Sequence, residues 1–213
     1  MASRVDKRSS ETRPVKENSV LRSGICLFAE KPSGEPCCHS GRLTGTTDVG
    51  QPSIESAAIF GASGGIGRAL VEALAQRRVA TIHAGSRSGN VPQGKGIHPF
   101  RFDYDTPSSL KNAAAGMADT PPQLVVVATG VLTLPDGTGP ERSYRQLEAD
   151  TMAQVLQLNT IGPALAAQAM LPLFPKAGRS VFAALSARVG SIGDNSYGGW
   201  HSSVHRKQPS ICW

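Results

Sequence analysis

Residues 57–75 read AAIFGASGGIGRALVEALA. The four apolar residues Ala57–Phe60 predict a short buried strand. A glycine-rich turn follows, and the apolar residues of Ile66–Gln76 then recur on one face at helical spacing. The stretch therefore predicts a strand that turns sharply into an amphipathic helix.

The chain beyond this stretch alternates strands and helices in the same way. We expect strands at Val79–Ala84, Ile97–Phe102, Gln123–Ala128 and Arg179–Ser186, and helices at Leu110–Met117 and Thr151–Phe174. Strands that are almost continuously apolar and alternate with helices are typical of a parallel sheet covered on both faces. The sequence predicts an α/β fold, a doubly wound parallel Rossmann sheet with helices on both faces.

Residues 1–52 differ in composition from the rest of the chain, being rich in Ser, Arg, Lys, Glu, Gly and Pro. They lack helical or strand periodicity beyond a short patch, Val20–Ala29. A targeting peptide is one alternative, but Asp6, Glu11 and Glu17 argue against an organellar presequence, and the apolar core of a secretory signal is missing. We expect a disordered or poorly ordered extension, or an over-long gene start.

The composition of the chain argues against membrane, nucleic-acid-binding and zinc-binding proteins. The 213 residues are 39% hydrophobic, and no run approaches the ~20 apolar residues that cross a bilayer, which excludes an integral membrane protein. The net charge of +6 is dispersed, which argues against a nucleic-acid partner. The cysteines, Cys26, Cys37, Cys38 and Cys212, lack zinc-site spacing and are expected to be free thiols. The sequence thus predicts a cytoplasmic protein without a metal, and leaves organellar import open.

The glycine turn predicts a phosphate site. Gly61, Gly65 and Gly67 fall where the strand must turn into the helix, and the lack of side chains lets a diphosphate approach the backbone. The N-terminus of the helix supplies free N–H donors and positive potential there. We expect these glycines, with Ser63 and Ile66, to contact a dinucleotide cofactor.

The glycine spacing GxxxGxG resembles that of the short-chain dehydrogenase/reductase family, and the resemblance spans about residues 56–202. The stretch LSARVGSIGDN resembles a small carbonyl-reductase-like subgroup of that family. The resemblance implies an NAD(P)-dependent oxidoreductase that reduces a small carbonyl compound or oxidises an alcohol by hydride transfer. It also implies a homo-oligomer paired through long helices such as Thr151–Phe174, whose apolar stripe could equally pack within its own chain. We expect the cofactor-binding domain over residues 53–202.

The residues after the second strand indicate which cofactor is bound. An acidic residue about 20 positions past the glycines holds the ribose of NAD, whereas an arginine accommodates the extra phosphate of NADP. This chain has Ser86-Arg87-Ser88 there, and no acid between Glu72 and Asp103. The sequence predicts NADP(H), with NAD as the weaker alternative and a solvated loop arginine as the alternative role of Arg87.

The resemblance implies two further cofactor contacts. Asp103 ends the third strand, where the family places an Asp against the adenine amino group. Ala128-Thr129-Gly130 stands where the family usually has Asn-Asn-Ala-Gly. Gly130 is kept, while Val127 and Ala128 replace the two asparagines, so we expect the cofactor ledge at Ala128 and Gly130 without one polar contact.

Two catalytic groups are implied by the resemblance. The family uses a Tyr four residues before a Lys, a Ser at the end of the fifth strand, and an Asn in the preceding helix. Asn159, in LQLNTIG, matches the Asn that holds a water of the proton relay. Ser186 matches the substrate-orienting hydroxyl; Ala187 replaces a second serine, so Ser191 stays an alternative.

The catalytic tyrosine is missing from its place. The residues four beyond Tyr104, Tyr144 and Tyr197 are Ser108, Glu148 and His201. A tail without helical periodicity, SVHRKQPSICW, fills residues 203–213. The genetic code permits a set of codons for this tail in which the addition of one base changes the reading frame and yields the family's catalytic helix. In that helix, the tyrosine stands at the position of Ser203. Lys207 falls in the lysine register.

The tail therefore predicts a one-base deletion, either natural or a sequencing or gene-model error. The chain as written is then expected to be an inactive, truncated short-chain oxidoreductase. The alternative is a non-catalytic dinucleotide-binding remnant that acts through protein contacts.

Overall fold

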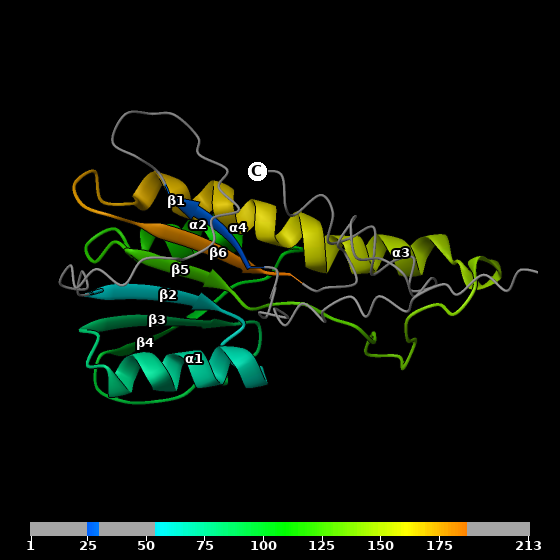
Figure 1. The fold of residues 1–213 in the computed structure, drawn as a ribbon, viewed down its shortest axis with the longest axis horizontal. Helices are drawn as coiled ribbons and strands as arrows, with labels where there is room; N and C mark the ends of the chain where they lie inside the picture. The colour runs from blue at the N-terminus through cyan, green and yellow to red at the C-terminus, as the bar shows by residue number, and fades with distance from the viewer. Residues whose placement is uncertain (1–24, 30–53, 187–213) are drawn as a thin grey trace, which may run out of the picture.

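The computed structural model describes residues 25–29 and 54–186. They form a six-stranded sheet with the order β1-β6-β5-β2-β3-β4 (Figure 1). The strands are β1 (Ile25–Ala29), β2 (Ser56–Phe60), β3 (Thr81–Ser86), β4 (Ile97–Arg101), β5 (Leu124–Val127) and β6 (Val181–Leu185). Strands β2 to β6 run parallel to one another, as predicted.

Helices cover both faces of the sheet, which confirms the predicted α/β fold (Figure 1). The α-helices are α1 (Gly65–Gln76), α2 (Pro107–Ala115), α3 (Ala149–Leu156) and α4 (Gly162–Met170). The shorter turns are η1 (Tyr144–Gln146), the π-helical η2 (Gln157–Ile161) and η3 (Leu171–Leu173). Helix α1 lies on one face, and α2 and α4 lie on the other (Figure 1).

Strand β2 lies in the interior of the sheet and divides two hydrophobic cores. Its five residues are all buried. Ile59 packs with Val71 of α1 in one core. Ala58 and Phe60 pack in the other core, with residues of α2 and α4 such as Met170. Because successive side chains of a strand point to opposite faces, a continuously apolar strand needs a helix layer on each side.

The order of the strands places a crevice at their carboxyl ends. The chain passes from β2 to β3 and β4 on one side, and returns to β5 on the other side of β2. The connections that leave β2 and β5 therefore diverge, and ligands of open parallel sheets bind at such a switch point.

The predicted long helix at Thr151–Phe174 is interrupted. Helix α3 passes through the π-helical turn η2 into α4, and the last residues form the 3₁₀ turn η3. Two residues explain the wide turn. Pro163 has no N–H to donate to the preceding turn. The Nδ2 of Asn159 donates to the carbonyl of Val155, 3.0 Å away, and occupies a helical acceptor.

Strand β1 is antiparallel to β6, with Ile25 opposite Leu185 and Ala29 opposite Val181. It belongs to the range 1–52, for which the sequence predicts a disordered or poorly ordered extension. These five residues are the described part of that range, and they form a strand. The remainder of 1–52 and the tail 203–213 lie outside the described residues.

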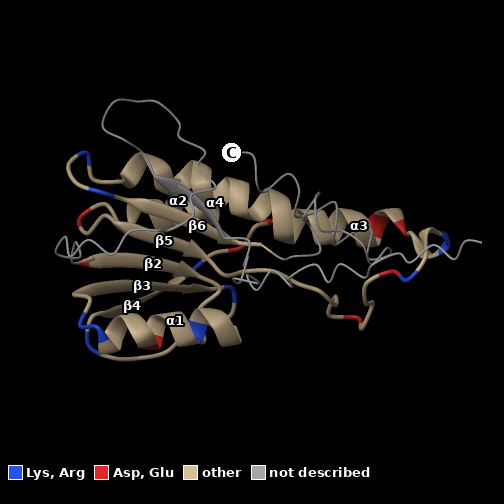
Figure 2. Ribbon diagram, in the orientation of Figure 1, with Lys and Arg blue, Asp and Glu red and all other residues tan. Residues whose placement is uncertain are grey.

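Charged residues lie mainly in the loops and helices, and the strands carry few (Figure 2). Helix α3 and the connection that precedes it extend beyond the carboxyl ends of the strands (Figure 1). Within residues 54–186, every helix is too short or too polar to cross a membrane. The same residues contain no cluster of three potential metal ligands.

Candidate nucleotide-binding site

The turn after β2 is built around two glycines. Gly61 has φ +88°, a conformation that favours glycine. The N–H groups of Gly61 and Ala62 both donate to the carbonyl of Gly85 at the end of β3, at 2.9 and 2.8 Å. A Cβ at Gly67 would collide with the carbonyl oxygen of Gly61. The turn and the first turn of α1 thus pack so closely that only glycine fits at position 67.

Gly65 has a different environment. It is exposed, and a Cβ there would meet no protein atom within 4 Å. The N-cap residue Gly64 provides no side-chain cap, and the first turn of α1 contains no acid. The N-terminus of α1 therefore presents N–H groups and the positive end of the helix dipole to open space, where an anion can approach the backbone.

The loop after β5 packs against this turn. The N–H of Ala128 donates to the carbonyl of Phe60, 2.9 Å away. A Cβ at Gly61 would lie 3.0 Å from the backbone nitrogen of Thr129, so the two loops almost touch. Gly130 is equally restricted, because its Cβ would lie 2.8 Å from the Oδ1 of Asn159. Small residues on both loops allow this close approach.

A cleft of about 290 Å³ opens at the carboxyl ends of the strands, between these loops and the end of β3. Its lining includes these residues predicted to bind a cofactor: Gly61, Ser63, Arg87, Asp103, Ala128 and Gly130. It also includes these residues that the sequence did not assign to a cofactor site: Gly64, Ser86, Phe102, Tyr104, Thr129, Val131, Pro135 and Leu158. Gly65, Ile66 and Gly67 lie in the first turn of α1 and outside the lining.

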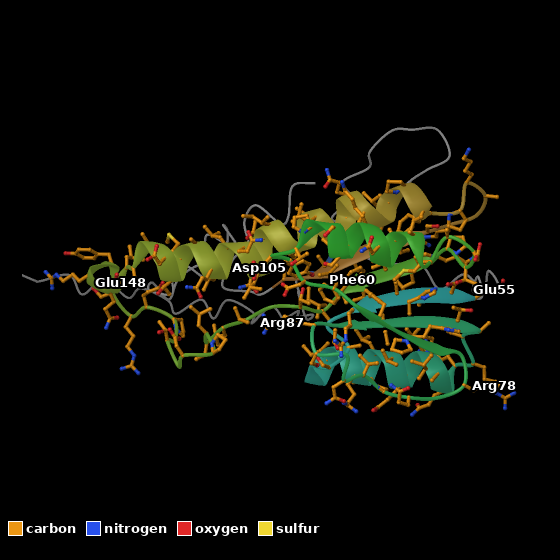
Figure 3. All side chains as sticks on the ribbon, turned by 180° about the vertical axis from the view of Figure 1, so that it is seen from behind. Glu55, Phe60, Arg78, Arg87, Asp105 and Glu148 are labelled. Atoms are coloured by element: carbon orange, nitrogen blue, oxygen red, sulfur yellow. The ribbon has the colours of Figure 1, made fainter. Side chains whose placement is uncertain are left out.

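The two charged residues of the lining come from neighbouring strands. Arg87 follows β3, at the end of the sheet where Phe60 lies and opposite to Glu55 and Arg78 (Figure 3). Its side chain is exposed, and within the described part of the chain it forms no hydrogen bond or ion pair. Asp103 follows β4 in a tight turn, where its Oδ1 accepts a hydrogen bond from the N–H of Asp105 at 3.1 Å. Arg87 is therefore free to bind an anion in the cleft.

Asn159 lies next to the cleft and holds the loop after β5, which forms one of its walls. It is only 3% exposed. Its Oδ1 accepts from the N–H of Val131 at 2.9 Å, and its Nδ2 donates to the carbonyls of Val131, at 3.1 Å, and Val155. The amide thus holds the loop after β5 against the π-helical turn. Its predicted part in a proton relay stays a prediction.

Ser186 directly follows β6, at the same end of the sheet as the cleft but outside its lining. Its Oγ is buried and has no hydrogen-bond partner among the described residues. A buried hydroxyl without a partner is costly, and a substrate oxygen could satisfy it. The other residues considered for catalysis, Ser191, Tyr197, Ser203 and Lys207, lie outside the described residues.

Tyr104 lines the cleft, a role that the sequence did not predict; in the sequence it was examined only as a catalytic tyrosine and rejected. It is 4% exposed, and its hydroxyl is 2.8 Å from the Oγ1 of Thr129, so it ties the loop after β4 to the loop after β5. Burial raises the pKa of the phenol well above its usual range, and the hydrogen bond to Thr129 only partly opposes this. The signal in the sequence was its place directly after Asp103, at a strand end.

Neither protein-family models nor curated proteins match the chain. Solved structures do match. The putative carbonyl reductase Sniffer of Caenorhabditis elegans is 21% identical, with a TM-score of 0.65 over 74% of this chain and 75% of that one. A putative short-chain dehydrogenase/reductase of Burkholderia multivorans with bound NADP is 20% identical, with a TM-score of 0.64 over 74% and 69%. An NADPH-bound carbonyl reductase from chicken fatty liver is 22% identical, with a TM-score of 0.59 over 74% and 67%.

These likenesses agree with the α/β fold and parallel sheet described above. The described part of the chain therefore has the fold of the short-chain dehydrogenases and carbonyl reductases.

Proposed function

We propose that the chain binds NADP(H) in the cleft, and that its site is that of an oxidoreductase of the short-chain type, which interconverts a small carbonyl compound and its alcohol. One observation carries the proposal. A glycine-rich turn and a helix N-terminus without a side-chain cap meet at the switch point of a parallel sheet. An arginine without a partner among the described residues follows the adjacent strand.

The residues of the cleft fit such a cofactor. The N–H groups at the start of α1 and the hydroxyl of Ser63 would hold the diphosphate, since Gly65 leaves open space before them. Arg87 would bind the 2′-phosphate and Asp103 the adenine amino group. Ala128 and Gly130 would form the ledge on which the cofactor lies, because neither presents a bulky side chain to the cleft. The structures with bound NADP and NADPH that share the fold support the choice of cofactor.

The bound cofactor would supply or accept a hydride. Ser186 would donate its hydrogen bond to the substrate oxygen, on which negative charge develops during hydride transfer. Asn159 would act indirectly, by holding Val131 and with it the wall of the cleft.

A second candidate function is a dinucleotide-binding protein without catalysis. It is favoured because neither of the two tyrosines among the described residues is placed to donate a proton. Tyr104 is buried and bonded to Thr129, and Tyr144 is 65% exposed in the turn η1, outside the cleft lining. Neither is followed by a lysine four residues on, as proton donation in the family requires.

Calorimetry and an activity assay test both functions. We expect NADPH to bind at least about tenfold more tightly than NADH, which corresponds to 1.4 kcal/mol. Equal affinities would refute the choice of NADP, and no binding of either would refute the site. NADPH binding without oxidation over a panel of aldehydes, ketones and quinones would support the non-catalytic candidate. Turnover that appears when the catalytic helix is restored by the one-base insertion would support the enzyme.

A further inference from the structure

The loop after β3 is held from inside by a serine. Ser86 ends β3 and is 1% exposed. Its Oγ accepts a hydrogen bond from the N–H of Gly89 at 2.9 Å, and Gly89 has φ +80°. The chain therefore turns back tightly across residues 86–89, and Arg87 is carried on the turn.

The same loop is held from outside by Arg101, the last residue of β4. Arg101 lies opposite Ser86 in the register of β3 and β4. Its Nη2 donates to the carbonyl of Ser88, 3.3 Å away. Its guanidinium also lies against Gly89, where a Cβ would come within 2.9 Å of the Nε. A side chain from the neighbouring strand thus holds the carbonyl of Ser88, the residue that follows Arg87.

We propose that Arg101 is a positioning residue for nucleotide selection: it holds the 86–89 loop so that Arg87 meets the 2′-phosphate of the cofactor. The inference rests on the proposed function and deepens it. A loop arginine that is ordered only on binding loses backbone and side-chain freedom, and a loop that is held in advance reduces this cost. Arg101 acts through the loop, because it is outside the cleft lining and its guanidinium is engaged with Ser88.

A double-mutant cycle tests this role. Arg101→Met, Arg87→Met and the double variant are compared with the unaltered chain. Arg78→Met, at the opposite end of the sheet, removes the same charge and serves as the control (Figure 3). Binding of adenosine 2′,5′-bisphosphate and of adenosine 5′-monophosphate is measured by calorimetry. The two probes differ by one phosphate, so their affinity ratio reports on the 2′-phosphate alone.

We expect Arg87→Met to weaken the bisphosphate about tenfold or more, as for loss of a charge-assisted hydrogen bond. Arg101→Met should weaken it about fivefold, while the monophosphate changes less than about twofold with either variant. In the Arg87→Met background, Arg101→Met should have no further effect, because it acts through Arg87. Arg78→Met should match the unaltered chain.

Three results would overturn the positioning role. Additive losses would mean that Arg101 meets the phosphate directly. An unchanged ratio in Arg101→Met, with a reduced ratio in Arg87→Met, would mean that the loop needs no support, and the proposed function would stand. If the unaltered chain bound neither probe, the proposed function would fail and the positioning role with it.

Discussion

The two ends of the sheet differ in which polar groups face open space. At the amino end, the Oε1 of Gln123 accepts from the N–H of Glu55 at 2.8 Å, and the hydroxyl of Ser56 donates to the carbonyl of Thr120 at 3.2 Å. The Nε2 of His83 lies 3.1 Å from the same carbonyl. At the carboxyl end, the start of α1 is uncapped.

Two side chains at the carboxyl end continue the contrast. Arg87 and the hydroxyl of Ser186 lack partners among the described residues. The Oγ of Ser180, directly before β6 at the amino end, is likewise buried without a partner among the described residues. The two ends therefore differ in the helix N-terminus and the arginine that only the carboxyl end presents beside the cleft. Substitutions at the two ends of the sheet test this difference.

The largest effect is expected at Gly67. Gly67→Val places a side chain against the carbonyl of Gly61 and forces the turn away from α1, so we expect a loss of about 3 kcal/mol or more in unfolding free energy. Urea denaturation followed by circular dichroism measures it. A variant as stable as the unaltered chain would show that the turn is loosely packed.

Asn159→Ala should rank second. It removes the hydrogen bonds of the side chain to the N–H and carbonyl of Val131 and to the carbonyl of Val155, at a cost of about 2–3 kcal/mol. Gln123→Ala, at the amino end, removes one exposed hydrogen bond and should cost less than about 1 kcal/mol. Denaturant midpoints compare the two variants. Equal losses would argue that Asn159 has no special part in fastening the cleft wall.

Gly65→Val separates binding from stability. A Cβ at Gly65 has open space around it, and valine is a better helix former than glycine, so the denaturant midpoint should be unchanged or slightly higher. NADPH binding should weaken about tenfold or more, or about 1.4 kcal/mol, because the side chain fills the space before the N–H groups. Unaltered affinity in calorimetry would show that the phosphates do not approach this point.

The smallest effect concerns pH and the amino end. Burial lowers the pKa of His83 below its ordinary value of 6.5, and nearby His98 adds to this, while the hydrogen bond to Thr120 opposes it. Below pH 6.5 the unfolded chain then binds a proton that the folded chain resists, so stability falls as the pH drops through this value and is level above it. His83→Gln should remove this fall, as measured by urea midpoints between pH 5.5 and 7.5. An identical pH profile in the variant would contradict the assignment.

The central strands and the glycine turn could be predicted because their signals are local. An apolar run such as Gln123–Ala128 and the glycines that follow Phe60 act within a few residues of themselves. Arg87 was predicted from its place after the second strand, and Asp103 from the family resemblance; both line the same cleft.

Features that depend on distant partners could not be predicted. The bond between Tyr104 and Thr129 joins two loops that no sequence period relates. The π-helical turn depends partly on Asn159, whose link to Val131 is a tertiary contact. Strand β1 was predicted as part of an extension, since its pairing with β6 has no local signal beyond a short apolar patch.

The pairing of β1 with β6 also orders events during synthesis. Residues 25–29 leave the ribosome about 150 residues before Val181–Leu185. At about 5–20 residues per second, β1 waits roughly ten to thirty seconds for the strand beside which it lies. The parallel strands β2 to β5 have been made by then, and β1 stays unpaired with β6 until Val181–Leu185 have been synthesised.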